Sequence, residues 1–518
     1  MGAYFCAMPK LFQHKFSPKE AADVVWVNEQ FAKWAGYSPH TCTVVWKKKS
    51  LDARSRVPFF LITAEVYALG EQRESELGFR LKSVCQARPV HIIGAGPAGL
   101  FCAMELIEQG IKPIVLERGK AVKERRRDLA RLNREKWVDP DSNYCFGEGG
   151  AGTYSDGKLY TRSNKRGPVQ KVLQCFVDHG APESILYDAH PHIGTNKLPQ
   201  LVEGLRESIL AHGGEIRFDT RVDGLVLESD RIVALQLNGG ATEKVEKVVL
   251  ATGHSARDIF EMLFEAKISI ESKPFALGVR LEHPQSIIDH IQYKCETRGD
   301  FLPPSSYSLV EQVQGRGVFS FCMCPGGIIA PAATAAGEVV VNGWSPSKRN
   351  GNFANSGFVV SVDDRDFQDF KSHGELRALR YQQHWERLAF QTTGSLSAPA
   401  QRMEDFIQGK LSADLPSNSY LPGLVSAQIS EVLSSQVHQR IKEALIALGK
   451  KMKAFRTNDA ILVGVESRTS SPIRIPRDSS TLNHPQLGNL FPCGEGAGYA
   501  GGIMSAALDG IRVAQAVK

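Results

Sequence analysis

Long apolar runs are missing from this sequence. No segment approaches the roughly 18 consecutive apolar residues that a membrane-spanning helix needs. Residues 1–19 also lack the apolar core of a secretory signal peptide. We therefore expect no membrane insertion and a cytoplasmic location.

Cysteine is present without a recognisable pattern. The ten cysteines form neither a disulfide framework nor Cys-x-x-Cys pairs, and no Cys/His spacing is typical of a zinc site. This favours a reducing compartment over a secreted protein, and it predicts no metal site.

Charge of neither sign dominates. The chain has 62 basic and 56 acidic residues, so its formal net charge is +6. Such a balance permits anionic partners without requiring them, and we do not expect nucleic acid among the partners. The 518 residues, of which 42% are hydrophobic, are enough for two or three domains. The oligomeric state is left open.

The clearest motif lies at residues 88–100, where a short apolar strand leads through a glycine-rich turn into an apolar helix. Gly94 permits the tight turn, Gly96 lets the backbone approach a pyrophosphate, and Gly99 lets the helix pack closely on the strand. The free N–H groups of the first helical turn then face the anion. This pattern predicts a dinucleotide site formed by Gly94, Gly96, Pro97, Ala98 and Gly99.

The remainder of a βαβ unit follows at the expected spacing. Residues 100–109 have helical composition, Gly110 closes that helix, and residues 114–116 form a second strand that ends at Glu117. An acidic residue at this distance from the glycine turn accepts hydrogen bonds from an adenosine ribose. We therefore expect Glu117 and the adjacent Arg118 at the cofactor.

A second glycine-rich loop occupies residues 488–502, again between an apolar strand and a helix, here from Ile503 to about Val517. FAD is long and its two ends are held by opposite ends of one chain, whereas an NAD domain needs no such closing element. The pair of loops resembles the glutathione-reductase-like superfamily of FAD proteins, in which the C-terminal helix directs its N-terminus at the flavin. The resemblance implies flavin contacts by Gly494, Glu495, Gly501, Gly502 and Ile503.

A third loop, at residues 146–159, has five glycines within eleven residues and few apolar anchors. A ligand gives such a loop its order, so we expect it beneath the flavin ring and the pyrophosphate, with its backbone N–H groups as donors. A flexible surface loop is the alternative. The residues expected at the cofactor are Gly149, Gly150, Gly152 and Thr153.

The superfamily resemblance implies two more cofactor contacts. In these flavoproteins the end of a strand packs on the adenine, which here points to Val222. The strand at residues 247–254 resembles their further turn over the cofactor, with Ala251, Thr252 and Gly253. Between the third loop and Val222, residues 198–212 are predicted to form an amphipathic helix.

Basic residues gather in two other segments. The stretch from Arg118 to Trp137 is predicted to be an exposed helix, one or two of whose arginines reach the pyrophosphate. Ahead of the first glycine turn, a predicted helix at 18–35 and strands at 43–46 and 59–66 indicate a small α+β unit. Its basic loop, residues 47–56, is either a solvated hairpin or a contact for nucleic acid or an acidic redox partner.

Over nearly the whole chain, these motifs resemble the bacterial-type uncharacterised FAD-dependent dehydrogenases. The resemblance is carried by residues 52–54, 94–99, 147–159, 192–195, 321–327, 466–472 and 494–502. It implies an α/β fold with a Rossmann-like FAD-binding domain split in sequence, an inserted mixed substrate domain and a small N-terminal α+β domain. The expected bounds are 1–86 for the N-terminal domain, 87–255 and 461–518 for the FAD-binding domain, and 256–460 for the substrate domain.

Cys322 and Cys324 are the most chemical residues of the expected substrate domain. Two thiols one residue apart form only a strained, easily reduced disulfide, which suits electron exchange with a flavin. On a strand, however, their side chains share one face, and buried reduced cysteines are ordinary small hydrophobes there. Both interpretations stay open.

Polar residues supply the other catalytic candidates. Glu466 and Arg468 lie in a dense run of charged and hydroxyl groups, and they are either near the flavin or in an internal salt bridge. Arg349 is a candidate for binding an anionic substrate. The candidates for acid/base work, none with a partner visible in the sequence, are His190, His192, His254 and His283.

The predicted function is that of a FAD-dependent oxidoreductase, which takes a hydride or electron pair from one small molecule and passes it to an acceptor. No second nucleotide-binding domain of the glutathione-reductase type is apparent, so NADH or NADPH is expected only as a transient reductant. A tRNA-modifying flavoprotein and a non-catalytic flavin carrier or sensor are the alternatives.

Overall fold

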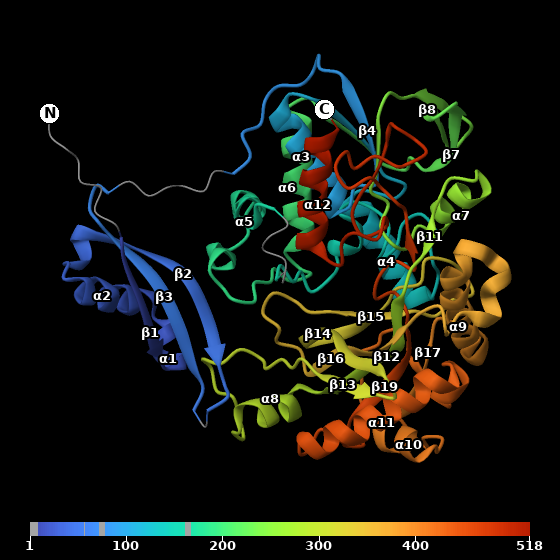
Figure 1. Cartoon of the computed structure of the whole chain (residues 1–518). Helices are drawn as coiled ribbons and strands as arrows, with labels where there is room; N and C mark the ends of the chain where they lie inside the picture. Colours follow the sequence, from blue (N-terminus) through green and yellow to red (C-terminus); the bar gives the residue numbers. More distant parts are fainter. Residues whose placement is uncertain (1–8, 56, 72–77, 161–166, 518) are drawn as a thin grey trace, which may run out of the picture.

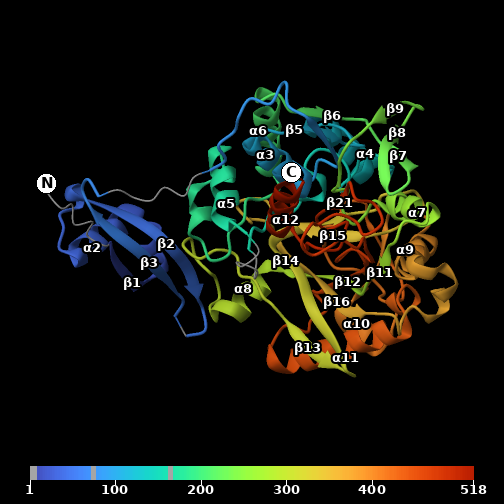
Figure 2. The ribbon, with the colours of Figure 1, turned by 45° about the horizontal axis from the view of Figure 1, so that its top comes forward.

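The computed structural model describes residues 9–55, 57–71, 78–160 and 167–517. In Figure 1 a small N-terminal sheet stands to one side of the rest of the chain, where a parallel sheet around β4 lies above a larger, mainly antiparallel sheet around β14. Figure 2 shows the same separation of the N-terminal sheet after a turn of the molecule. The chain therefore builds its layers around two large sheets.

The N-terminal unit is an antiparallel sheet, in the order β1-β3-β2, that is covered by helices. Val27 and Phe31 of α2 are fully buried in its core. The predicted helix at 18–35 is divided, because the Asp23 carboxylate caps the start of a second helix by accepting from the Trp26 N–H. The elements are β1 (Lys10–Phe16), α1 (Pro18–Ala22), α2 (Val24–Ala35), β2 (Cys42–Asp52) and β3 (Phe59–Ala68).

Residues 47–52 of the predicted basic loop are strand, so the predicted start of the loop is wrong, whereas β2 and β3 pair antiparallel as a hairpin requires; residue 56 lies outside the described residues. β2 continues to Asp52, with Lys49 opposite Ile62 of β3. Cross-strand pairing outweighs the local charge, because the Lys49 ammonium lies 4.9 Å from the centroid of the Phe60 ring. The Lys49 N–H also donates to the Tyr187 carbonyl at 2.8 Å, which ties this unit to the rest of the chain.

A five-stranded parallel sheet, in the order β21-β10-β4-β5-β6, forms the Rossmann-like part of the fold. Helices α3 and α12, from opposite ends of the chain, pack side by side on it (Figure 1). A Cβ on Gly510 would lie 2.2 Å from the Ala98 carbonyl oxygen, so this close packing requires glycine. The elements are β4 (Pro89–Ile93), α3 (Pro97–Gln109), β5 (Lys112–Leu116), α5 (Val169–Asp178), α6 (Leu198–Ala211), β6 (Glu215–Arg217), β10 (Val248–Leu250), β21 (Leu490–Pro492) and α12 (Ile503–Ala516), with a separate sheet of β7 (Val222–Glu228), β8 (Arg231–Leu237) and β9 (Thr242–Lys244).

Helix α4 (Val122–Glu135) corrects the prediction of an exposed helix at 118–137. Arg125 is fully buried, and so are Leu129 and Leu132 on the same face. Helical periodicity turns these positions inward and leaves the other arginines of the helix exposed. Two charged side chains of this helix, Arg125 and Asp128, are therefore buried inside the protein.

The large sheet has eight strands, in the order β13-β14-β16-β12-β19-β17-β18 with β15 paired to β14. It extends past residue 460, because β19 pairs with β12. Helices α10 and α11 pack against it (Figure 2). The elements are β12 (Phe275–Pro284), α8 (Gln285–Tyr293), β13 (Val310–Val313), β14 (Arg316–Pro331), β15 (Val341–Trp344), β16 (Phe353–Val362), α9 (Arg377–Thr393), β17 (Ala398–Arg402), α10 (Met403–Gln408), β18 (Leu424–Ser426), α11 (Ser435–Lys451) and β19 (Ile461–Glu466), with α7 (Arg257–Glu265) and the pair β11 (Glu271–Ser272) and β20 (Ile473–Arg474) beside it.

Within the described ranges, no helix combines the length and the apolar character that a bilayer crossing requires.

Candidate functional site

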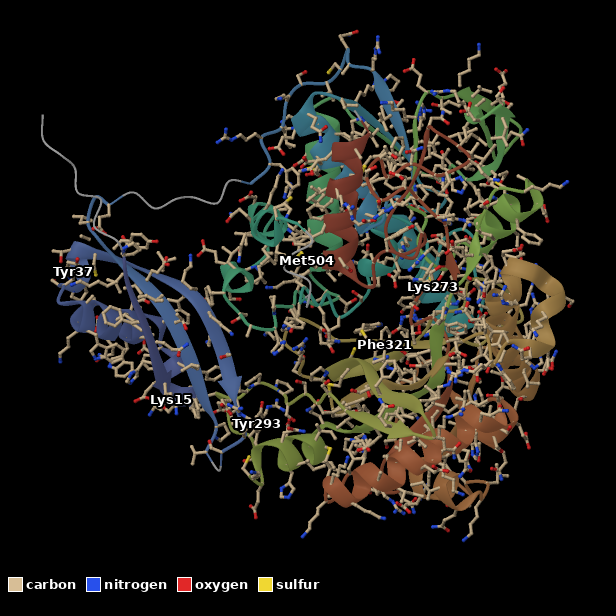
Figure 3. All side chains as sticks on the ribbon, in the orientation of Figure 1. Lys15, Tyr37, Lys273, Tyr293, Phe321 and Met504 are labelled. Atoms are coloured by element: carbon tan, nitrogen blue, oxygen red, sulfur yellow. The ribbon has the colours of Figure 1, made fainter. Side chains whose placement is uncertain are left out.

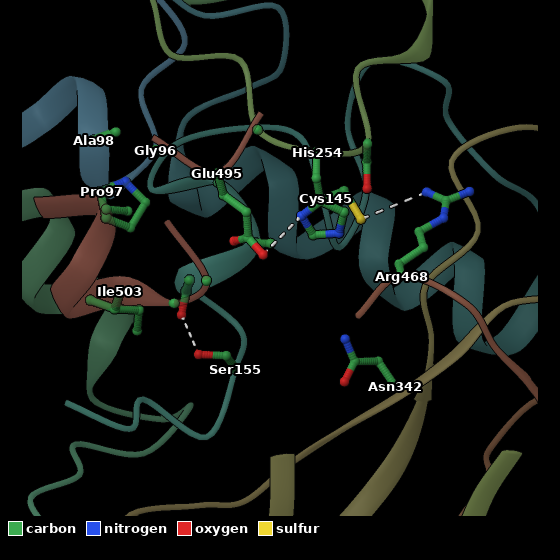
Figure 4. A pocket seen from close by; sticks show the side chains of 18 of the residues that line it. Gly96, Pro97, Ala98, Cys145, Ser155, His254, Asn342, Arg468, Glu495 and Ile503 are labelled. Carbon is green, nitrogen blue, oxygen red and sulfur yellow. Dashed lines mark hydrogen bonds and ion pairs between the residues drawn. The ribbon is translucent and has the colours of Figure 1, made fainter. Parts of the chain in front are cut away.

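A cavity of about 980 Å³ lies between the carboxyl ends of the parallel strands and β14 of the large sheet. The strand ends supply Gly94 after β4, Glu117 after β5 and Ala251 after β10. Ligands of open α/β sheets bind outside the carboxyl ends of the strands, so this is the expected place for one. Figure 4 shows part of the lining from close by.

Most of the residues predicted to bind the cofactor line this cavity. They are Gly94, Gly96, Pro97, Ala98, Glu117, Arg118, Gly150, Gly152, Val222, Ala251, Thr252, Gly253, Glu495, Gly501, Gly502 and Ile503. The other four lie behind its wall and hold the loops together: Gly99, Gly149, Thr153 and Gly494. For example, the Thr153 hydroxyl donates to the Glu148 carbonyl at 2.7 Å.

The three glycines of the first turn differ in what a side chain would meet at their positions. Gly94 has φ +104, and a Cβ there would lie 2.5 Å from the Ala251 carbonyl oxygen. A Cβ on Gly99 would lie 2.0 Å from the Gly94 carbonyl oxygen, so the helix needs glycine to reach the strand. At Gly96 the nearest atom to such a Cβ is the Gly150 Cα, at 4.0 Å. Only at Gly96 does the protein itself leave room for a side chain, and this position faces the cavity.

The third glycine loop packs directly on the first turn. The Gly149 N–H donates to the Ala95 carbonyl at 2.8 Å. A Cβ on Gly150 would lie 3.1 Å from the Gly96 Cα, so the two loops touch through glycine backbones. The loop is therefore part of the cavity wall and not a free surface loop.

Arg125 fixes the third loop from behind. Its guanidinium donates to the carbonyls of Asn143, Tyr144, Glu148 and Gly150 at 2.7 to 3.1 Å. A Cβ on Gly147 would lie 2.4 Å from the Arg125 Cδ, so the side chain passes against bare backbone. This arginine does not line the cavity; it shapes the loop that does.

Glu117 is bonded to protein backbone as well as facing the cavity. One carboxylate oxygen accepts from the Ala95 N–H at 2.8 Å, and the other accepts from the N–H groups of Gly119 and Gly147 at 2.9 Å. A carboxylate offers about four acceptor positions, so three backbone bonds leave capacity for about one more donor. The residue thus joins the strand end to both glycine loops.

Ion pairs occupy the end of the cavity beside Glu117. Arg118 binds Asp141 and Asp258 at 2.7 and 2.9 Å, and its guanidinium lies 4.3 Å from the centroid of the Phe146 ring. Val222 completes this end of the lining. Because Arg118 pairs with two carboxylates, its guanidinium is fixed in position and its positive charge is balanced within the protein.

The N-terminus of α12 marks the other end of the cavity. Gly501, Gly502 and Ile503 line it, and Figure 4 shows Ile503 and Pro97 on the same side. Across from them His254 Nδ1 lies 3.5 Å from the Glu495 carboxylate. The positive end of the helix dipole therefore faces this part of the cavity.

Cys322 and Lys158 form the β14 side of the lining. The Lys158 ammonium lies 3.7 Å from the Cys322 sulfur and 3.4 Å from Asp156. The hydrogen bond with Cys324, helped by the nearby cations, lowers the pKa of Cys322 to about 5 despite burial. Cys324 itself is fully buried and lies outside the lining, and burial raises its pKa.

Glu466 and Arg468 are both in internal ion pairs, one of the two alternatives that the sequence left open. Glu466 is fully enclosed beside Arg280 at 2.9 Å, and burial raises its pKa to about 7. Arg468 binds Glu338 at 3.1 Å and Glu386 at 3.2 Å, yet it also lines the cavity (Figure 4). Arg468 is thus the one of the two that reaches the site.

Two of the four candidate histidines line the cavity and two lie outside its lining. His190 and His254 line the cavity. His192 lies behind it, where its ring nitrogen is 3.1 Å from the Ser347 carbonyl oxygen, and burial lowers its pKa to about 4. His283 is completely buried against Phe455, which leaves it no acid/base role at the cavity.

Several cavity residues were not predicted. Asp156 and Lys158 lie inside the third glycine loop, where charged residues amid glycines were the available signal. Arg349, which was predicted as a candidate for binding an anionic substrate, lines the cavity and forms an ion pair with Asp156 at 2.7 Å. Residues 306–308 also belong to the lining, and no sequence pattern marks them. Met504, labelled in Figure 3, lines the cavity next to Ile503, within the segment 496–504 that the superfamily resemblance places along the flavin.

Models of four protein families match parts of the chain. The model described as "FAD-dependent protein, C-terminal domain-like" matches residues 274–469, and the one described as "FAD dependent oxidoreductase" matches residues 190–318. A model described as "FAD binding domain" matches residues 87–129. Residues 8–67 match a domain of unknown function.

Among curated proteins, an uncharacterised protein of Clostridium beijerinckii is 41% identical over 435 residues, which is 83% of this chain and 80% of that protein. A thiamine thiazole synthase of Aeropyrum pernix is 25% identical over 182 residues, 32% of this chain and 55% of the synthase. Among solved structures, glycine oxidase from Bacillus cereus has a TM-score of 0.31 at 13% identity, covering 83% of this chain and 94% of that one. L-proline dehydrogenase from P. horikoshii has a TM-score of 0.31 at 12% identity, covering 84% and 93%.

Proposed function

This chain belongs to one family with the Clostridium beijerinckii protein, among the FAD-dependent oxidoreductases, and we propose that it passes a hydride or an electron pair between a small molecule and an acceptor. FAD is its cofactor. One observation carries the proposal: a single cavity has glycine backbone on one wall and Cys322, Lys158 and Arg349 on the other.

The glycine wall fits the pyrophosphate of FAD. Gly96 leaves a space that a Cβ would partly fill, although no protein atom requires that space. The first N–H groups of α3 are unpaired within the helix and attract an anion. We therefore assign the pyrophosphate to the turn at Gly94 to Ala98, with Gly150 and Gly152 opposite.

The remaining lining assigns the two ends of FAD. Glu117 keeps acceptor capacity for a ribose hydroxyl, and Val222 offers an apolar surface to the adenine. The flavin end then lies at Gly501 to Ile503, where the α12 dipole stabilises negative charge on the reduced ring. Bound FAD supplies a reversible acceptor for two electrons there.

The β14 wall is where the substrate fits. Arg349 and Lys158 bring two cations to this wall and Asp156 brings one carboxylate, so the small molecule we expect is an anion. His254 and Glu495 lie close enough to pass a proton between the flavin end and the cavity. NADH or NADPH enters this scheme only as a transient reductant.

The experiment is the visible spectrum of the purified protein, followed anaerobically as NADH or NADPH is added. Flavin that is bleached by nicotinamide identifies a reductase whose acceptor is to be sought. Flavin that neither reagent changes points to an enzyme reduced by its own substrate or to a flavin carrier, and anionic candidate substrates then distinguish the two. A protein that lacks flavin even after reconstitution with FAD contradicts the proposal. Co-purifying RNA, released by salt, would favour the tRNA-modifying alternative.

A further inference from the structure

Two cysteine thiols lie together at the β14 wall, and flavin binding does not account for them. Cys322 lines the cavity and Cys324 is buried directly behind it, where its thiol donates to the Cys322 carbonyl oxygen at 3.2 Å. The Lys158 ammonium is 3.7 Å from one sulfur and 3.8 Å from the other. Both thiols are free in this structure.

The backbone of β14 is distorted where it carries these thiols. Its pairing with β16 shifts register between Phe321 and Cys324. Cys322 has φ +48, in the left-handed region that non-glycine residues rarely adopt. Strain of this kind persists where the surrounding structure requires it, often at functional sites. Here it places both sulfurs beside one ammonium, since Lys158 Nζ lies within 3.8 Å of each of them.

The charges around the thiols favour one thiolate. Arg280 contributes a further contact, because its guanidinium lies 3.4 Å from the Cys324 sulfur and 2.8 Å from the Cys322 carbonyl oxygen. The cluster holds three cations and two carboxylates, namely Lys158, Arg280, Arg349, Asp156 and Glu466. When both carboxylates are ionised, one positive charge is left over; a Cys322 thiolate balances it in the reduced pair, and an anionic substrate balances it when the two sulfurs are joined.

We propose that Cys322 and Cys324 form a second two-electron centre that exchanges electrons with FAD, an inference that rests on the proposed function. In its oxidised form a bond joins the two sulfurs. Anionic reduced FAD supplies two electrons and one proton, the sulfur–sulfur bond breaks, Cys322 leaves as thiolate and Cys324 as thiol, and FAD returns to its oxidised form. A strained disulfide between such close residues is a good electron acceptor, which favours this direction.

The position of each thiol assigns its part in the exchange. Cys322 faces the cavity, so it is the thiol that a molecule in the cavity meets first. Cys324 has no exposed surface, so it closes the internal bond. Lys158 is a positioning residue, because its charge holds Cys322 in the reactive form.

The test is an anaerobic titration of the FAD-loaded protein with dithionite. Wild type is expected to take up four electrons per flavin, and Cys324→Ser is expected to take up two. Cys175→Ser is the matched control, because Cys175 is buried like Cys324 but lies outside the cavity lining, and it should still take up four electrons. Uptake of only two electrons by wild type, or of four by Cys324→Ser, overturns the proposal.

Two measurements separate failure of this proposal from failure of the proposed function. Peptide mapping of the air-oxidised wild type should find Cys322 joined to Cys324, and this readout needs neither flavin nor a variant. Protein that binds FAD but yields only free thiols at both positions overturns the thiol centre and leaves the flavin function standing. In the reduced wild type, alkylation of Cys322 by iodoacetamide, followed on its own peptide, should be almost as fast at pH 6 as at pH 8. An ordinary thiol slows roughly a hundredfold over that interval, and such slowing would contradict the thiolate.

Discussion

Replacing Gly96 by alanine tests directly whether the first glycine turn holds the cofactor. Gly96 has φ −75, which alanine adopts freely, and the nearest atom to the added Cβ is 4.0 Å away. The protein alone therefore accommodates the methyl group. A ligand whose pyrophosphate lies against this backbone does not, so the variant should lose FAD affinity without losing its fold.

The expected magnitudes follow from that geometry. Gly96 is the N-cap of α3, where alanine is less favourable than glycine, but a Gly→Ala change also stabilises by about 0.4–1 kcal/mol through the unfolded chain. The two effects oppose each other, so the unfolding free energy of the FAD-free protein should change by less than about 1 kcal/mol. Forcing one extra carbon into a packed contact costs about 1–3 kcal/mol. That cost corresponds to roughly 5- to 150-fold weaker binding of FAD.

Flavin-fluorescence titration of the apoprotein measures the affinity, and thermal unfolding of the same preparation checks the fold. Gly488→Ala is the matched control, because its Cβ would also meet no atom within 4 Å but it lies outside the cavity lining. It should bind FAD as wild type does. A Gly96→Ala protein whose FAD affinity stays within twofold of wild type would refute the assignment of the pyrophosphate to this turn.

Three further predictions concern Arg125, His283 and Lys158. Arg125→Met removes four hydrogen bonds to loop carbonyls and should lower the unfolding free energy by at least roughly 3 kcal/mol in urea titrations; a loss under about 1 kcal/mol would contradict its part in shaping the third glycine loop. Burial lowers the pKa of His283 to about 4, so protonation of this side chain favours the unfolded state. The contribution of the neutral side chain to the unfolding free energy is therefore fully present above pH 6.5 and falls by up to roughly 3 kcal/mol as the pH drops toward 4. His283→Gln keeps a donor for the Phe455 carbonyl and should lose less stability between pH 7 and pH 5 than wild type, whereas an equal loss would show that this histidine is not responsible. Lys158→Met removes the ammonium beside Cys322, so iodoacetamide alkylation of that thiol at pH 6, followed on its own peptide in the reduced protein, should slow, and an unchanged rate would assign the thiolate to another cause.

Short-range patterns explain why much of the site could be predicted. The roles of Gly94 and Gly99 depend on residues within the same turn and on the strand beside it, and the structure gives both the predicted close approach. The helix from Ile503 and the strand that ends at Glu117 were likewise found from local composition. The positive φ of Gly94 and the approach of Gly99 to the Gly94 carbonyl are local causes of this kind, whereas the approach of Gly94 to Ala251 depends on a strand distant in the sequence.

The wrong or open predictions share a different cause. Residues 47–52 of the predicted basic loop form strand because β3 offers apolar partners across the hairpin. Arg125 was assigned to the surface with its neighbours, since nothing in its own helix shows that the glycine loop supplies four carbonyls. Glu466 could not be assigned from the sequence, because its partner Arg280 lies 186 residues away.

The sequence by itself determined that this chain has two glycine-rich turns, each between a strand and a helix, and an αβ arrangement suited to FAD. Turn geometry and helix ends depend on local sterics and local hydrogen bonds, which neighbouring residues control. Only the tertiary structure decided which charges and thiols meet at the cavity. Whether a buried arginine, carboxylate or thiol is stable and reactive depends on the partner that folding brings to it, and for Cys322 those partners are Lys158 and Arg280, from distant parts of the chain.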